Sequence, residues 1–150
     1  MVAVSGGENS IGLVHMLHQG INTDQKKLLF IPVLCWIDEG CVFGLSEDVR
    51  RKNSVEIINL LQKYGFDINI AHLEDFNNSD NEPINIFRDT NLIKYDSQKY
   101  VTLKNTFNCM YDKSSREEFL VQSRRRILLN AARNVISLSV LPLTLCFYPF

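Results

Sequence analysis

Residues 2–10 read VAVSGGENS, which is a short apolar run, a pair of glycines between polar residues, and the start of a longer patterned segment. The run Val2–Val4 predicts a strand, and Gly6-Gly7 predicts a tight turn after it. A helix is expected from about Asn9 or Ser10 to Gln19, because apolar residues recur there on one helical face. Strand, turn and helix in this order form the first unit of a βα repeat.

The same alternation continues downstream. Leu28–Ile37 is almost wholly apolar, as expected of a strand buried on both faces of a parallel sheet. A helix is predicted from Ser46, which can cap it, to Tyr64, and a third strand from Phe66 to Leu73. The repeat predicts an α/β fold with an open parallel sheet, flanking helices and right-handed crossovers.

Regularity then lapses, and we interpret the stretch from Glu74 to Asp112 as an insertion or a functional loop. A last helix is expected from Ser114 or Ser115, because each precedes a glutamate by three residues, as in a capping box. Ser137–Val140 is a candidate fourth strand.

The predicted organisation is a partial domain at residues 1–136, with its insertion at about 74–112, and an aberrant hydrophobic tail at 137–150. The uncharged stretch Val135–Phe150 is shorter than the ~20 residues of a membrane span and contains two prolines, so no membrane helix is expected. We expect the chain to be a truncated form that lacks part of its domain.

Composition limits the possible functions. Lys and Arg number 16 against 17 Asp and Glu, so the formal net charge is -1. The overall charge of the chain therefore cannot bind nucleic acid. Any RNA would have to be bound by a local basic patch or by a partner protein. None of the 4 cysteines forms a CxxC pair, and no signal peptide is recognised, which favours a cytosolic protein with reduced thiols.

The loop Ser5–Ser10 is a candidate anion site. Gly6 and Gly7 allow the backbone to turn and present N–H groups, and the following helix adds free N–H groups and its positive dipole end. The loop also follows a strand of a parallel sheet, where ligands of such folds bind. An ordinary strand-to-helix turn explains the glycines equally well at this stage.

This loop resembles the Ser-Gly-Gly-x-Asp-Ser motif of the PP-loop ATP pyrophosphatases. Ser5, Gly6, Gly7 and Ser10 match the motif, whereas Asn9 replaces its aspartate. That change removes a carboxylate that could help to bind magnesium or to compensate the charge of the phosphates. The segment from Trp36 to Gly40, which contains Asp38, is similar to an Ile-Asp-Glu-Gly segment of the tRNA thiolation branch.

Over residues 2–136 the chain resembles the cytoplasmic tRNA 2-thiolation protein 2 family. The shared features are the loop without aspartate, the insertion after the third strand, and the arginine-rich helix segment Arg124–Leu129. The resemblance implies a non-catalytic cytoplasmic subunit of wobble-uridine 2-thiolation. Its partners would be tRNA, a catalytic paralogue in a heterodimer and, indirectly, a thiocarboxylated ubiquitin-like sulfur carrier.

The resemblance also implies specific sites. A weak or vestigial site for ATP and magnesium would involve Ser5, Gly6, Gly7, Asn9, Ser10 and Asp38. Arg124 and Arg126 would contact tRNA phosphates, although a solvated helix face explains these arginines equally well. No catalytic residue and no separate metal site are predicted. The alternatives are an active PP-loop enzyme that adenylates tRNA and a universal-stress-type nucleotide-binding module.

Three further side chains are interpreted as structural. His15 and His18 lie three residues apart on the predicted first helix. Two histidines are too few ligands to hold a metal ion, so packing or surface roles are expected. Cys41 is expected to be an ordinary thiol, because no neighbouring base that would activate it is evident.

Overall fold

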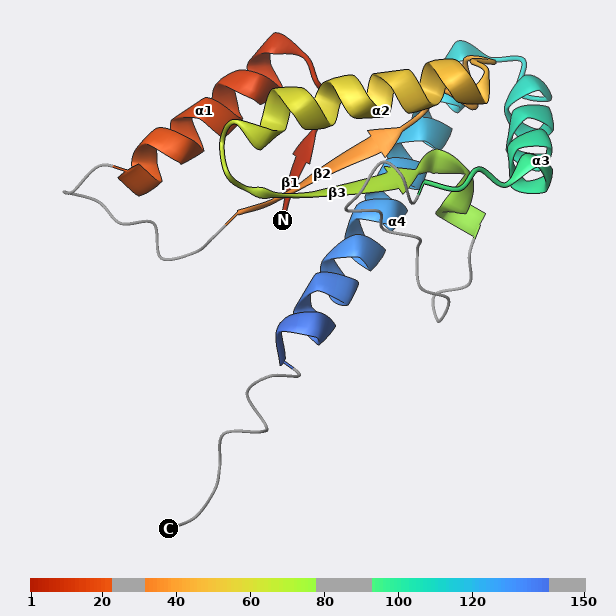
Figure 1. Cartoon of the computed structure of the whole chain (residues 1–150). Coiled ribbons are helices and arrows are strands. Elements are labelled where there is room, and N and C mark those ends of the chain that lie inside the picture. The colour runs from red at the N-terminus through yellow and green to blue at the C-terminus, as the bar shows by residue number, and fades with distance from the viewer. Residues whose placement is uncertain (23–31, 78–92, 141–150) are drawn as a thin grey trace.

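The computed structural model describes residues 1–22, 32–77 and 93–140. The elements in chain order are β1 (Val2–Val4), α1 (Glu8–Asn22), β2 (Val33–Asp38), α2 (Glu47–Gln62), β3 (Asp67–His72), the 3-10 turn η1 (Leu73–Asn77), α3 (Ser97–Asn108) and α4 (Lys113–Val140) (Figure 1).

The three strands form one parallel sheet in the order β1-β2-β3. The register places Ala3 beside Cys35, and Cys35 beside Asn69. β2 is therefore the central strand, which agrees with its nearly continuous apolar sequence. Of the predicted strand Leu28–Ile37, the described part shows β2 from Val33, with Pro32 before it, and residues 28–31 lie outside the described part. The predicted fold class, an open parallel α/β sheet with flanking helices, is confirmed.

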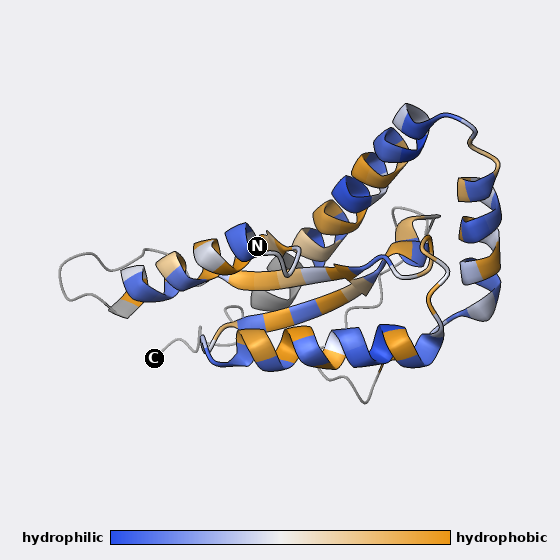
Figure 2. Ribbon diagram, turned by 90° about the horizontal axis from the view of Figure 1, so that it is seen from above, coloured by the Kyte–Doolittle hydropathy of each residue, from blue (hydrophilic) through white to orange (hydrophobic). Residues whose placement is uncertain are grey.

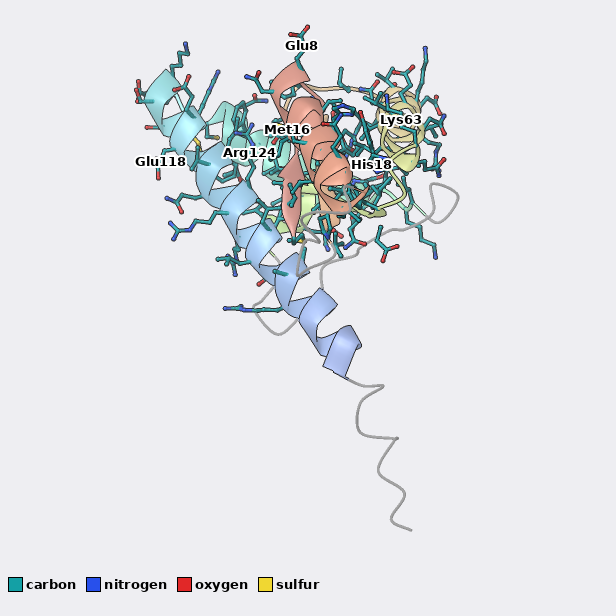
Figure 3. The ribbon with its side chains drawn as sticks, turned by 90° about the vertical axis from the view of Figure 1, so that its left-hand side faces the viewer. Glu8, Met16, His18, Lys63, Glu118 and Arg124 are labelled. Atoms are coloured by element: carbon teal, nitrogen blue, oxygen red, sulfur yellow. The ribbon has the colours of Figure 1, made fainter. Side chains whose placement is uncertain are left out.

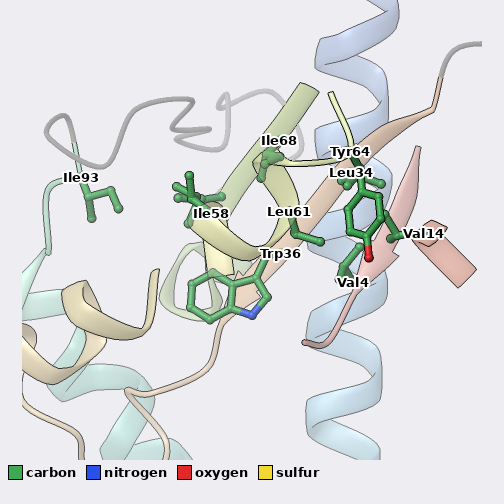
Figure 4. Packing of buried hydrophobic residues seen from close by; sticks show 10 residues of the cluster. Val4, Val14, Leu34, Trp36, Ile58, Leu61, Tyr64, Ile68 and Ile93 are labelled. Carbon is green, nitrogen blue, oxygen red and sulfur yellow. The ribbon is translucent and has the colours of Figure 1, made fainter. Parts of the chain in front are cut away.

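Helices α1 and α2 cover one face of the sheet. Val14 of α1 and Leu61 of α2 are fully buried there against Leu34 of β2. Figure 4 shows this cluster, in which Tyr64 lies beside Leu34 and Val14. Every second residue of a strand points its side chain to this face, so the strands supply apolar side chains at every second position. The helices supply them at every third or fourth position.

Helix α4 covers part of the opposite face. Ile127 of α4 is fully buried in a second cluster with Ala71 and Leu73, and Ala131 of the same helix is also fully buried. In Figure 2 the central strand is mostly hydrophobic, the strand beside α2 alternates between hydrophilic and hydrophobic residues, and the helices mix both kinds, as one-sided packing requires. Ala3 of β1 is exposed, so α4 leaves this side of the first strand open.

The stretch 74–112 is more regular than its sequence indicates. It contains most of η1 and all of α3, whose N-cap Asp96 accepts hydrogen bonds from the backbone N–H groups of Gln98 (2.9 Å) and Lys99 (3.1 Å). In α3 only Leu103 is fully buried. The helix therefore has almost no apolar periodicity from which it could be predicted. Residues 78–92 of the predicted insertion lie outside the described part.

Two predictions about the last helix are wrong. Its N-terminus is held by Asp112, whose Oδ2 accepts the Ser115 N–H at 3.0 Å, so neither Ser114 nor Ser115 is the cap. A carboxylate caps as well as a hydroxyl and lies earlier in the chain. Ser137–Val140, the candidate fourth strand, continues α4, because adding a turn to an existing helix is easier than starting a new element. None of the helices in the described residues is long and apolar enough to span a membrane.

Candidate functional site

The loop between β1 and α1 turns at Gly6. Its φ of +81° lies in the region that favours glycine, and a Cβ there would come within 2.6 Å of Ile57 Cδ1. Ser5 and Ser10 face each other across the turn with their hydroxyl oxygens 3.2 Å apart. Ile11 donates the first helical hydrogen bond, to the Gly7 carbonyl, so the N–H groups before it lie at the open end of α1.

A cleft with a volume of about 520 Å³ opens at the carboxyl ends of β1 and β2. Ser5 and Ser10 line it from the loop, Asp38 and Glu39 from the end of β2, and Arg124 from α4. Trp36 also lines the cleft. The cleft therefore brings together segments that are more than 80 residues apart, through the parallel packing of the strands.

An ion pair joins the two sides of this cleft. The Arg124 guanidinium donates to both carboxylate oxygens of Glu39, through Nε to Oε1 and through Nη2 to Oε2 at 2.7 Å. The hydrogen bonds with Glu39 raise the pKa of Arg124, against the opposing effect of partial burial. Figure 3 shows Arg124 on α4, whereas Glu8 at the start of α1 points away from the ribbon.

A second arginine lies beneath the cleft in the protein interior. Arg50 of α2 is 1% exposed, and its Nε donates to Asp38 Oδ2 at 2.7 Å. Its Nη2 donates to Glu74 Oε2 at 2.7 Å and lies 3.2 Å from His72 Nδ1. One guanidinium thus joins the end of β2 to the end of β3 and to η1, as its fork of donors allows.

Asp38 is held as a carboxylate by this arrangement. Burial favours the neutral acid, but hydrogen bonds from His72 and Gly40 and the charge of Arg50 outweigh it and lower the pKa of Asp38. The Gly40 N–H donates to Asp38 Oδ1 at 2.9 Å, so both carboxylate oxygens are engaged within the protein. Asp38 therefore fixes the turn that carries Glu39 into the cleft.

The residues before α3 close over Arg50. The guanidinium carbon of Arg50 lies 4.5 Å from the centroid of the Tyr95 ring, and the rings of His72 and Tyr95 form a T-shaped pair with their centroids 4.9 Å apart. Lys99 adds an ion pair to the buried Asp75 at 2.8 Å. A cation above an aromatic face is attracted to it, so the network also anchors α3 to the sheet.

The predicted nucleotide residues gather at one end of the sheet. Ser5, Ser10 and Asp38 line the cleft, and Gly6 and Gly7 form the turn beside it. Asn9 is exposed on the first turn of α1 and does not line the cleft. That these residues bind a nucleotide stays a prediction.

The two arginines predicted to contact tRNA lie in different environments. Arg124 lines the cleft and is paired with Glu39, whereas Arg126 is exposed on α4. Their contact with tRNA stays a prediction. The sequence interpretation missed Arg50, although a charged residue four positions before the buried Ser54 and eight before Ile58 continues the inward stripe of α2.

Other candidates are part of the packing. Cys41 is fully buried, and burial raises the pKa of its thiol to about 12, which agrees with an ordinary core thiol. The ring of His18 lies edge-on to Tyr64, and its Nδ1 is 3.0 Å from the Tyr64 carbonyl oxygen, as expected for packing. Among the described residues, no group of three or more His, Cys, Asp or Glu side chains could hold a metal ion.

Fold and site together define an α/β protein with a glycine turn and a polar cleft at the carboxyl ends of a parallel sheet. Comparison with known proteins finds cytoplasmic tRNA 2-thiolation protein 2 of Xenopus tropicalis, 40% identical over 75 residues. The proteins of the same name from Danio rerio and Homo sapiens are 36% and 33% identical over 75 and 76 residues. The resemblance predicted from the sequence is thereby confirmed over about half of the chain, a shorter span than the predicted residues 2–136.

These matches cover 49 to 50% of this chain but only 14 to 15% of each relative. The chain therefore matches about a seventh of the length of these curated relatives. No family model matches the chain, and no solved structure does.

We predict that Arg50→Met lowers the free energy of unfolding by about 3–5 kcal/mol, because it leaves the buried carboxylates of Asp38 and Glu74 without their cation. The control is Lys52→Met, which removes a cation from the same helix at a side chain that is 77% exposed and should cost less than ~1 kcal/mol. Urea denaturation of both variants measures the difference. Similar losses would show that the network does not support the fold.

The penalty for Arg50→Met should also depend on pH. Because the fold lowers the pKa of Asp38, the stabilisation is complete above the unfolded value of about 3.9 and is lost as the pH falls below it. The gap between wild type and variant should therefore stay constant above about pH 4 and narrow as the pH falls further, through the lowered pKa of the folded state.

Proposed function

We propose that the protein acts in the 2-thiolation of tRNA as a cytoplasmic, non-catalytic subunit. The observation that carries this proposal is the similarity, over half of the chain, to relatives named cytoplasmic tRNA 2-thiolation protein 2. Those names state the place and the process for the relatives. The cleft at the sheet end supports the same role for this chain, since it is where an α/β fold of this kind holds its ligand.

The cleft binds ATP or pyrophosphate weakly in this proposal. The turn at Gly6, the open first turn of α1 and the guanidinium of Arg124 offer donors and positive charge to phosphate oxygens. Asn9 carries no carboxylate for a magnesium ion, and Asp38 is already committed to Arg50 and Gly40. Weak binding without turnover follows from this set of groups.

The chemical step belongs to a partner in this account. The proposed partner is a catalytic paralogue that activates the wobble uridine with ATP and inserts sulfur relayed from a thiocarboxylated ubiquitin-like carrier. With a net charge of -1, this chain offers little attraction for tRNA by itself. The exposed Arg126 would add one phosphate contact to a surface that the paralogue largely supplies.

The nucleotide proposal predicts where pyrophosphate binds. In NMR titrations with pyrophosphate or ATP, the backbone amides of Gly6 and Gly7 should shift most, because they lie at the turn beside the cleft. The Gly65 amide is an internal reference, since this glycine also has a positive φ but lies in the turn after α2, far from the loop in sequence. Equal shifts at the three amides would contradict a site at this turn. Sustained pyrophosphate release from ATP would instead indicate an active enzyme.

The thiolation role predicts a change in tRNA. Cells depleted of the protein should lose most of the 2-thiouridine at the wobble position, measured by mass spectrometry of nucleosides from purified tRNA. Re-expression of the wild-type gene should restore it, and an unrelated uridine modification in the same sample serves as the control. An unchanged level of 2-thiouridine after depletion would contradict the proposed function.

A further inference from the structure

Arg124 is the one positively charged side chain that lines the cleft within the described residues. Two carboxylates line the same cleft, those of Asp38 and Glu39. Asp38 is paired from below with Arg50, which it shares with Glu74, whereas Glu39 is paired with Arg124 itself. An anion that enters the cleft therefore meets a guanidinium whose bidentate position is already occupied.

We infer that Glu39 competes internally with phosphate for Arg124, so that a polyphosphate ligand binds by displacing the Glu39 carboxylate from the guanidinium. The inference rests on the proposed function of the cleft as a nucleotide or pyrophosphate site, and it assigns the residue that holds the phosphate. Carboxylate and phosphate both fit the fork of an arginine, so one can replace the other without a change in the arginine's geometry.

The exposure of the pair makes such an exchange feasible. The side chain of Arg124 is 41% exposed and that of Glu39 is 21% exposed, so the freed carboxylate can return to water. The side chains of Arg50 and Asp38 are 1% and 4% exposed, and separating them would leave two charges without solvent. The ligand can therefore separate Glu39 from Arg124 while Asp38 stays bound to Arg50.

The backbone around Glu39 is held still during this exchange. The Gly40 N–H is bound to Asp38, and a Cβ at Gly40 would lie 2.6 Å from Arg50 Cγ, so the turn packs tightly on the buried arginine. The Glu39 side chain alone has to rotate. A ligand with one charge gains little from the exchange, whereas pyrophosphate offers several oxyanions at once, so Glu39 favours polyphosphates over simple anions.

The test is a titration of the full chain with pyrophosphate, followed by the fluorescence of Trp36, the single tryptophan, which lines the cleft. Glu39→Gln should bind pyrophosphate about two- to five-fold more tightly, the range expected when a half-exposed ion pair no longer competes. Arg124→Gln should bind it about ten-fold more weakly, as expected for a lost charge-assisted bond.

Two controls isolate the exchange from general charge effects. Arg125→Gln removes the same charge from an exposed neighbour on α4 and should leave the affinity within about two-fold. Glu39→Gln made in the Arg124→Gln background should have no effect, because the contested cation is gone. Thermal melts of each variant establish that it is folded, and Arg124→Lys, which keeps the charge but not the fork, should lie between wild type and Arg124→Gln.

Weaker binding by Glu39→Gln would overturn the inference, because Glu39 would then help to hold the ligand. Equal tightening in both backgrounds would overturn it as well, because the effect would be general electrostatics. Absence of binding in wild type and Glu39→Gln alike would refute both this exchange and the nucleotide site. None of these results changes the 2-thiouridine measurement, so the failure of the exchange and that of the thiolation role are distinguishable.

Discussion

The guanidinium of Arg50 is the constraint on which the rest of the site depends. It lies in the interior, where a lone charge is costly, and it is held by Asp38 from β2 and Glu74 from η1. Because its partners come from consecutive strand ends, it fixes the relative positions of those ends. The turn after β2, the start of η1 and the ring of Tyr95 all take their places around this one group.

Two different helices supply the buried arginine and the accessible one. α2 places Arg50 inward with Ser54 and Ile58, while α4 brings Arg124 to the rim of the cleft. The inner pair, Arg50 with Asp38, gives rigidity, because separating it would leave both charges buried without water to solvate them. The outer pair gives a replaceable contact, and the proposed ligand acts there. The architecture thus assigns stability and binding to two different arginines that both pair with carboxylates from the β2 end.

Strand and helix order could be predicted from the sequence because local pattern determines it. Val2–Val4 followed by Gly6 indicates a strand and turn without knowledge of the fold. The buried network could not be predicted, because Arg50 and Glu74 are 24 residues apart and their contact depends on how α2 packs on the sheet. Helix α3 was missed for a related reason: it buries little, and its position depends on Lys99 and the ring of Tyr95.

The most direct measurement is a crystal structure of the chain with bound pyrophosphate. The account predicts density in the cleft beside Ser5 and Ser10, with a phosphate oxygen on the Arg124 guanidinium, the Glu39 carboxylate turned away, and the Arg50–Asp38 bond unchanged from 2.7 Å. Pyrophosphate bound elsewhere on the surface, or bound in the cleft with the Glu39–Arg124 pair intact, would contradict it.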